Sequence, residues 1–495
     1  MTRILIHRWG VVAFFIALCI SAIGQELDTL QLTLHDAIAI SRKNSPEAIA
    51  ARHSFLASYW EHKSVQAAYL PSLTLTSTPN LNRSISSIIQ PDGSEKFVER
   101  NQLTTGLTLT VNQNIPFTGG SIFMTTSLQR IDLFSNNTSS YQSSPITIGY
   151  SQKLLGYNSM KWQRRNEPIR YQATKKQYVQ TLEFVGANTI NHFFNLATAQ
   201  NNLEIAEFNY ANADTLYRFA EGRYNLGTIT ENELLQLEIN KLTEETNMMN
   251  ARVSVDNYTQ TLRSYLGIAS KTVIVVNVTP DVPRFNVEGD LALNYAHENN
   301  PEIDWMKYRE IDSHRQVANA KGNVGLKADL YAQVGLTQTS ADLSGAYQGL
   351  LDQEYISIGI RVPILDWGVG RGKVKVSESN RDRILTQLTQ DRNTFDLNVD
   401  RVVKQFNLQS DRVTIAMKTD ETTKRRHEVA RKLYLLGKST VLDLNASIAE
   451  RDKARRNFVS ALHSYWSLYA ALRYLTMFDF EKKTAITEDY EYLLK

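Results

Sequence analysis

The stretch Tyr224-Asn225-Leu226-Gly227-Thr228-Ile229-Thr230 separates two long segments of helical periodicity, which together run from Asn158 to Leu266. On the ascending side a seam recurs every seven positions, at Leu182, Thr189, Leu196, Leu203 and Tyr210, with Val185 between the first two. This spacing is typical of a coiled coil. At about 1.5 Å per residue, the ascending segment predicts a rod roughly 100 Å long. The segment is therefore expected to form a long helical hairpin with its tip at Gly227.

The same hairpin occurs a second time. A shift of 210 residues places Tyr224, Leu226 and Gly227 on Tyr434, Leu436 and Gly437, and no gap is needed over the whole hairpin. The descending arm of the second copy has a seam of its own, at Phe458, Ala461, Tyr465, Leu468, Leu472 and Leu475. The sequence therefore predicts a tandem duplication.

Composition excludes some classes of function. The chain has 495 residues, with 54 basic and 51 acidic side chains and a net charge of +3. This near balance provides no basic stripe of the kind that nucleic acid requires, so no nucleic-acid partner is expected. The single cysteine, Cys19, precedes the first repeat, which leaves the rest of the chain without disulfides or thiol chemistry.

The N-terminus has the three parts of a secretory signal peptide. Basic Arg3 and Arg8 precede an apolar run at 11–20, and the small residues Ala22 and Gly24 follow it. This pattern predicts a signal peptide at 1–24, removed before Gln25. A membrane anchor would need a longer apolar run, and lipidation of Cys19 would need a smaller residue before it. No later run is apolar over transmembrane length, so a chain that crosses a membrane would do so with strands.

Two repeats are expected: residues 25–268 and 289–480, separated by a linker at 269–288 and followed by a loosely held tail at 481–495. Each repeat opens with helical sequence broken at a proline, Pro46 or Pro301. The pattern then alternates between apolar and polar residues, at Ile146–Tyr150, Leu330–Leu336 and Ile356–Val362. Strands that cross an outer membrane alternate in this way. A soluble sheet with one buried face would show the same alternation, so the pattern alone leaves both open.

The first repeat contains an insertion. The proline breaks match at a shift of 255 and the later elements at 210, which places about 45 additional residues between Leu75 and Ile146. Alternating runs at 107–113 and 122–128 flank the turn residues Pro116–Gly120, which predicts an added β-hairpin. We expect long outer loops at 82–101 and 135–144 and a short turn at 117–120. Alternatively, the hairpin folds outside the membrane.

Catalytic and ligand-binding motifs are weak. His314 and His427 each lack a second histidine at helical spacing, and no nucleotide-binding or esterase motif is present. Gly368-Val369-Gly370-Arg371-Gly372 could hold an anion at a helix start, but a strand-to-helix corner explains these glycines more simply. Pro168 is expected to kink or restart the first long helix. Enzyme activity, a cofactor and a metal are therefore not expected.

Several short motifs in a fixed order carry a family resemblance. They are the Asn-Pro-Glu type helix breaks near 46 and 301, Leu70-Pro71-Ser72-Leu73, Val362-Pro363-Ile364-Leu365-Asp366, and the two Tyr-x-x-Gly tips. In this order they resemble the TolC-like outer-membrane efflux proteins. The resemblance implies an α+β membrane channel-tunnel, built from a duplicated helix–strand–strand–long helical hairpin unit. Three subunits would form one outer-membrane β-barrel, continued by a periplasmic α-barrel.

The resemblance also implies a function and its partners. The chain would be a passive outer-membrane exit duct of a tripartite efflux pump or type I secretion system. It would form a homotrimer, contact outer-membrane lipid, and open when a periplasmic adaptor and an inner-membrane pump dock. The trimer would have eighteen strands with the inserted hairpin and twelve without it. The alternative hypothesis is a soluble periplasmic coiled-coil scaffold or adaptor without a pore.

Site residues follow from the same resemblance. The adaptor-facing tips would be Leu226, Gly227, Thr228, Leu436, Gly437 and Lys438. Asp443 and Glu233, each six residues after a tip glycine, would form a periplasmic gate in which crowded like charges raise pKa values and favour cations. Ala446 stands where many family members have a second acid. Alternatively, each acid complements the positive end of its helix.

Overall fold

The computed structural model describes residues 29–268, 273–436 and 438–494. The expected signal peptide, its cut before Gln25, Cys19 and the tip residue Gly437 lie outside the described residues. The chain divides into two compact units. The helical unit contains the described residues up to 55, residues 176–300 and those from 395 onward, and the sheet unit contains 56–175 and 301–394. Within the described ranges, no helix combines the length and apolarity that a membrane crossing requires.

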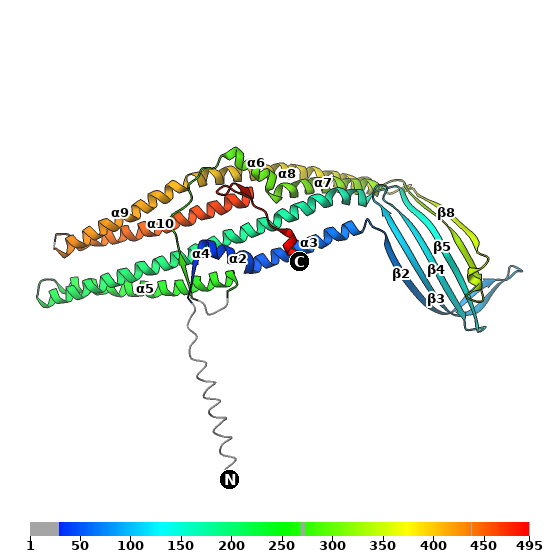
Figure 1. Cartoon of the computed structure of the whole chain (residues 1–495), viewed down its shortest axis with the longest axis horizontal. Helices are drawn as coiled ribbons and strands as arrows, with labels where there is room; N and C mark the ends of the chain where they lie inside the picture. Colours follow the sequence, from blue (N-terminus) through cyan, green and yellow to red (C-terminus); the bar gives the residue numbers. More distant parts are fainter. Residues whose placement is uncertain (1–28, 269–272, 437, 495) are drawn as a thin grey trace, which may run out of the picture. The chain divides into compact units, whose positions relative to one another are not determined.

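The sheet unit contains an antiparallel sheet of six strands in the order β2-β3-β4-β5-β7-β8. Figure 1 shows neighbouring strands of this sheet side by side. The strands are β2(Ser72–Ile89), β3(Glu95–Ile115), β4(Gly120–Leu133), β5(Thr138–Leu155), β7(Lys327–Ser340) and β8(Leu351–Arg361), with a short 3-10 turn η1(Gly345–Tyr347) between the last two. The inserted segment supplies β3 and β4, which lie inside the sheet between β2 and β5.

The expected loops at 82–101 and 135–144 are wrong. β2 and β3 stay paired from Ser72 opposite Asn112 to Ile89 opposite Glu95, so only a short turn joins them. β4 and β5 are likewise paired up to Leu133 opposite Thr138. The ladder is made of backbone hydrogen bonds, which polar residues form as well as apolar ones. The apolar alternation therefore marks only part of each strand.

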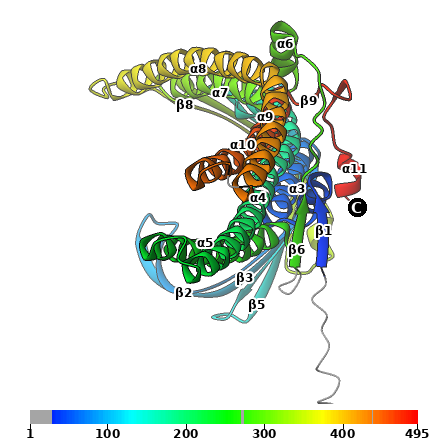
Figure 2. The ribbon, with the colours of Figure 1, turned by 90° about the vertical axis from the view of Figure 1, so that its left-hand side faces the viewer.

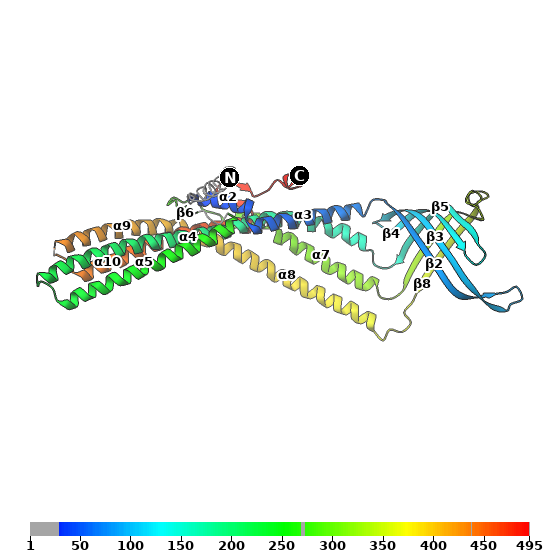
Figure 3. The ribbon, with the colours of Figure 1, turned by 90° about the horizontal axis from the view of Figure 1, so that it is seen from below.

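Helices of the sheet unit include the later part of α3(Pro46–Ala67), the first part of α4(Ser159–Asn225), α7(Pro301–Gly322) and the first part of α8(Val369–Asn407). Figure 3 shows α7 beside α8, where Lys321 pairs with Glu378 at 2.9 Å and Arg309 with Asp391 at 3.1 Å. The helix breaks before Pro46 and Pro301 are confirmed. A restart at Pro168 is wrong, because α4 continues through this residue.

The helical unit packs the two hairpins around one core. It contains α2(Leu34–Asn44), α5(Glu231–Leu266), α6(Gly289–Asn299), α9(Gln409–Leu435) and α10(Val441–Thr476), with the remaining parts of α3, α4 and α8. Seam residues Leu196, Tyr465 and Leu472 are fully buried there. The second ascending arm is two helices rather than one, because helical structure is interrupted at Leu408 between α8 and α9.

A small parallel sheet joins the start of the first repeat to the linker. β1(Thr29–Thr33) pairs with β6(Val273–Asn277), and Figure 2 shows the two strands side by side. Each repeat was expected to open with helical sequence, but the described part of the first repeat opens with this strand instead. The reason is local: Thr33 caps α2 in a reciprocal hydrogen-bonded box with Asp36, which fixes the helix start one residue later.

The tail after residue 480 is held more firmly than expected. β9(Phe478–Asp479) pairs with β10(Thr484–Ala485), and α11(Tyr490–Leu493) follows. The ring of Tyr490 lies 5.4 Å from that of Phe55, and Ile486 and Leu493 pack against the same buried cluster. These three apolar side chains hold the described part of the tail against the cluster, and their spacing is not that of a helical seam, so sequence periodicity did not predict the contact.

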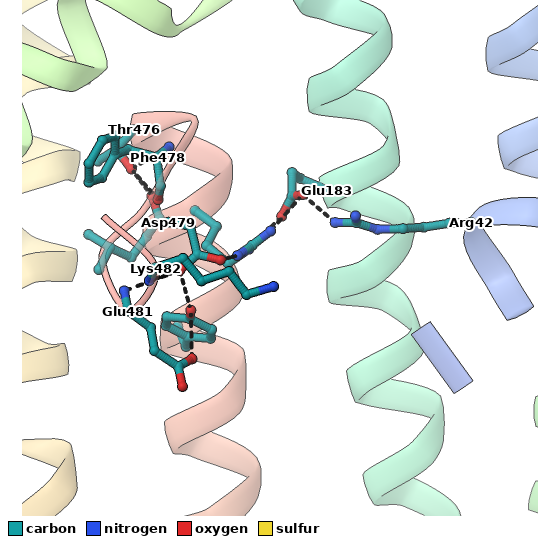
Figure 4. Close-up of polar contacts among 10 residues, drawn as sticks. Arg42, Glu183, Thr476, Phe478, Asp479, Glu481 and Lys482 are labelled. Atoms are coloured by element: carbon teal, nitrogen blue, oxygen red, sulfur yellow. Dashed lines mark hydrogen bonds and ion pairs between the residues drawn. The ribbon is translucent and has the colours of Figure 1, made fainter. Parts of the chain in front are cut away.

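A buried ion cluster connects this C-terminal hairpin to the helices. Glu183 of α4, 4% exposed, receives bonds from Arg473 Nε at 2.8 Å and Nη2 at 3.0 Å, and pairs with Arg42 of α2 on its other side. Figure 4 shows Glu183 between Arg42 and the Asp479 region. Arg473 also pairs with Asp479 of β9. Burial alone would raise the pKa of Glu183, but the guanidinium groups of Arg473 and Arg42 outweigh burial and lower it.

Candidate functional site

One face of the six-stranded sheet is apolar and exposed. The strand register places Leu73, Val111, Met124, Ile148 and Val334 in one row across the first five strands. Their neighbours on this face include Leu75, Leu109, Ile122, Ile146, Ile356, Ile358 and Ile360. Ile148 is 45% exposed and Ile356 73% exposed. A soluble sheet would bury such a face, whereas a face open to lipid must be apolar.

On β3, β4, β5 and β7 the opposite face is mostly polar and less exposed, with an aromatic contact between Phe123 and Tyr331. It carries Thr110, Thr125, Thr147 and Ser357, each of which is next in sequence to a residue of the apolar face. Thr147 is buried, although the isoleucines on either side of it are exposed. Side chains that are polar and sheltered on one face, and apolar and exposed on the other, match a strand between a water-filled lumen and lipid.

The sheet has two open edges. Within the described residues, β2 pairs only with β3 and β8 only with β7. Each outer strand therefore presents a row of backbone N–H and C=O groups without ladder partners in this chain. Long edge strands of this kind are completed by another chain or by closure of the sheet.

Both hairpin tips have the same backbone closure. Thr228 N–H donates to the carbonyl of Arg223 at 2.9 Å, and Lys438 N–H donates to that of Leu433 at the same distance. Gly227 has φ +70°, the left-handed conformation that glycine adopts without strain after a helix. Leu226 is 79% exposed and its counterpart Leu436 is 68% exposed. Both tips therefore present this leucine to solvent.

Glu233 and Asp443 each close a capping box at the start of a descending helix. Thr230 N–H donates to Glu233 Oε2 at 3.1 Å, and Thr440 N–H donates to Asp443 Oδ2 at 3.2 Å. The Thr440 hydroxyl also donates to Asp443, at 2.6 Å, and these bonds lower the pKa of Asp443. Within one chain, this lowering of the pKa is opposite to the rise expected for a gate of crowded acids. The helix-start role is thus present in the structure, and the gate role stays a prediction.

Two exposed apolar stripes were not recognised in the sequence as surfaces. One lies on α5 at Leu235, Ile239, Leu242, Met249 and Val253, and the other consists of Leu408, just before α9, with Ile415 and Val429 of α9. The spacings of three, four and seven on α5, and of seven and fourteen in the second stripe, are those of coiled-coil seams. Heptad spacing can be read from a sequence, but a seam that packs within a chain and a seam that packs between chains have the same spacing.

A family model for outer membrane efflux proteins matches residues 37–268 and 292–476. The chain belongs to the outer membrane efflux protein family. The matched ranges cover both repeats, so this membership supports the duplicated channel-tunnel fold. Members of this family are passive channels of the outer membrane and not enzymes. The alternative hypothesis of a soluble scaffold is therefore not supported.

Solved outer-membrane channels have the same fold as this outer membrane efflux protein. The CmeC channel of Campylobacter jejuni is 17% identical with a TM-score of 0.66, over 93% of this chain and 88% of that one. VceC of Vibrio cholerae is 15% identical with a TM-score of 0.62, over 90% and 95%. The open state of MtrE of Neisseria gonorrhoeae is 14% identical with a TM-score of 0.57, over 92% and 90%. No curated protein matches the chain.

The glycine-rich corner of this efflux protein is occupied by one of its own side chains. Asp366 accepts bonds from the N–H groups of Gly368 and Gly370, both at 2.9 Å. A carboxylate thus already holds the donors that an anion would use, which favours the strand-to-helix corner over an anion site. In the ranges that the structure describes, no group of three or more His, Cys, Asp and Glu side chains could hold a metal ion.

Proposed function

We propose that this outer membrane efflux protein is one subunit of a trimeric exit duct, passive in itself, that serves a tripartite efflux pump or a type I secretion system. The observation that carries the proposal is the sheet, with its exposed apolar face and two open edges. The duct would lie in the outer membrane with its helices in the periplasm. The chain would reach that site after removal of the signal peptide before Gln25.

Closure of the sheet requires other copies. If β8 of one copy pairs with β2 of the next, the contact is head-to-tail, and such contacts form a ring when the rotation between copies closes. Three copies of this six-stranded sheet would give eighteen strands. The apolar face would then contact lipid and the polar face would line a water-filled lumen. This arrangement removes both open edges and covers the exposed isoleucines.

The stripes on α5 and α9 support the same ring. Both stripes are exposed within one chain, and both have heptad spacing. A second copy of the chain offers the complementary stripe with the same periodicity. Packing of α5 of one copy against α9 of the next would bury both, and repetition around the ring would produce an α-barrel.

The test of the ring is disulfide formation between the two edge strands. Residues directly opposite each other in neighbouring strands are close enough for a disulfide. Because Cys19 lies in the proposed signal peptide, introduced cysteines would be the only ones in the mature chain. A cysteine at Ser357 of β8 is combined with one on the polar face of β2, placed in turn at Thr74, Thr76, Thr78, Asn80 or Asn82.

At least one combination is expected to give covalent dimers and trimers on non-reducing gels after mild oxidation of intact outer membranes. The single-cysteine variants are the controls and should stay monomeric on the same gels. Failure of every combination, or a ladder that continues past the trimer, would contradict the proposed ring.

The adaptor would dock on the two tips. Leu226 and Leu436 are exposed apolar residues of the tips, which also include Gly227, Thr228, Gly437 and Lys438. Buried leucines contribute to a contact mainly through the apolar area that they remove from water. Aspartate at both positions should therefore abolish co-purification of the adaptor from crosslinked cells. The matched control places aspartate at Leu291 of α6, which is exposed but lies outside the tips and both stripes. Retention of the adaptor by the tip variant would refute the assignment.

Asp443 and Glu233 would line the periplasmic entrance as a gate. Asparagine at position 443 can still accept the Thr440 N–H but has no charge, so it separates the gate role from the capping role. We expect Asp443→Asn to weaken cation preference and multivalent-cation block in planar-bilayer recordings, with an unchanged melting temperature. Glu233→Gln is the matched variant in the first repeat. Unchanged selectivity and block would leave only the capping role.

A further inference from the structure

A pocket of about 590 Å³ lies within the helical unit, between α4, α9 and α10. α9 lines it with Asp420, Lys424, His427 and Arg431, whose spacing of three and four places them on one helix face. Ile205 and Phe208 of α4 provide apolar wall. The volume lies in the range of sites for small organic molecules, which are mostly apolar with a few placed polar groups.

Two acceptors of the pocket lining are buried without a donor. His427 is 5% exposed and Asp420 is 6% exposed. His427 Nε2 and Asp420 Oδ1 receive no hydrogen bond from any residue that the structure describes. A buried acceptor without a partner costs free energy unless something else donates to it. Of the two, His427 Nε2 points to an occupant that carries an N–H or O–H group.

The hydrogen bonds of His427 fix which of its nitrogens is the acceptor. The Ser447 hydroxyl donates to the carbonyl of Leu444 at 2.7 Å, so its oxygen accepts from His427 Nδ1 at 3.2 Å. Burial lowers the pKa of His427, and the charges of Arg451 and Arg431 lower it further, so the ring is neutral at neutral pH. In a neutral ring with Nδ1 protonated, Nε2 has only a lone pair.

The charge of the pocket favours an anion. Its lining has five cationic side chains, Lys424, Arg431, Lys432, Arg451 and Arg455, against three carboxylates, those of Glu204, Asp420 and Glu428. In the described part of the chain, Lys424, Arg431 and Lys432 form no ion pair. Cations that lack a carboxylate partner, near an apolar wall, attract a carboxylate, and they disfavour a metal cation at His427.

We propose that this pocket binds a small aromatic carboxylate that also carries a hydroxyl group. The ring would lie against Ile205 and Phe208, and the carboxylate would contact Lys424 and Arg431. The hydroxyl would donate to His427 Nε2. A free carboxylate without a hydroxyl leaves Nε2 without a donor, and a neutral phenol leaves the cations without a counter-charge.

The test is calorimetric titration of the full-length protein in detergent with 4-hydroxybenzoate, benzoate and phenol as probes. 4-Hydroxybenzoate should bind about fivefold more tightly than benzoate, which corresponds to one net hydrogen bond. Phenol should bind more weakly than both. Salt at 1 M should weaken the binding of the two carboxylates but not that of phenol. Absence of saturable binding, or equal affinities for 4-hydroxybenzoate and benzoate, would overturn the proposal.

Variants assign the binding to this pocket. At position 427, the amide N–H of asparagine can replace the Nδ1–H donor, but asparagine has no acceptor at the position of Nε2. Glutamine is one bond longer, and its amide oxygen reaches the position of Nε2. His427→Asn should bind 4-hydroxybenzoate and benzoate with about equal affinity, and His427→Gln should keep part of the preference for 4-hydroxybenzoate. Arg431→Gln should lower the affinity for both carboxylates several-fold. Arg425→Gln, an exposed residue of α9 outside the pocket, is the charge-matched control, and equal losses from the two arginine variants would also overturn the proposal.

Discussion

Replacing Glu183 with glutamine is expected to lower the free energy of unfolding by about 3 kcal/mol, because it removes the buried carboxylate that two partly buried guanidinium groups share. Arg473 would retain Asp479 but lose its bidentate partner, and Arg42 would lose its carboxylate. Breaking a buried pair costs far more than breaking an exposed one, since the remaining charge stays poorly solvated. Urea unfolding followed by helical circular dichroism in detergent measures the change.

Glu207→Gln is the matched control. Glu207 lies on the same helix and pairs with Arg252 at 3.3 Å, but both side chains are about half exposed or more. Exposed pairs contribute roughly 0–1 kcal/mol, so this variant should lose less than about 1 kcal/mol. Equal losses in the two variants would show that burial of the Glu183 cluster contributes nothing.

The same cluster predicts a pH dependence. The pKa of Glu183 is lowered in the folded chain, so its contribution to stability is fully present above its ordinary value of 4.5. The contribution is lost as the pH falls through the lower folded value, because the protonated acid no longer pairs with the arginines. The wild type should therefore lose stability between neutral and acid pH more steeply than Glu183→Gln. Parallel curves for the two proteins would contradict this assignment.

Arginine at Met124 is expected to prevent accumulation in the outer membrane, while arginine at the adjacent Thr125 is tolerated. The two residues are neighbours in β4 and lie on opposite faces of the sheet. In the proposed duct Met124 faces lipid, where an arginine near the midplane costs about 2–4 kcal/mol. Thr125 faces the water-filled lumen, where the guanidinium group stays hydrated.

The measurement is immunoblotting of the purified outer-membrane fraction, together with a shift in gel mobility on heating that reports a folded sheet. Thr125→Arg is the control, since it introduces the same side chain one residue away. Similar amounts of both variants in the outer membrane would contradict the assignment of the apolar face to lipid. Loss of both would show that β4 tolerates no arginine on either face.

Much of the fold is determined by local sequence signals. The heptads around Leu196 and Leu472 predict the long helices, the shift of 210 predicts the duplication, and Gly227 predicts a tip. Alternation within a strand gives the two faces of the sheet. The heptads and the alternation repeat every two, three, four or seven residues. Neighbouring side chains therefore indicate them without information from the rest of the chain.

The tertiary structure decided what depends on distant residues. Glu183 meets Arg42 across 141 positions and Arg473 across 290, and no local pattern indicates either pairing. Likewise, His427 was dismissed in the sequence for lack of a second histidine, yet its surroundings come from α4 and α10. The strand ends and the exposed stripes on α5 and α9 were also beyond prediction. Periodicity fixes which side of an element is apolar, but only the path of the chain decides what that side contacts.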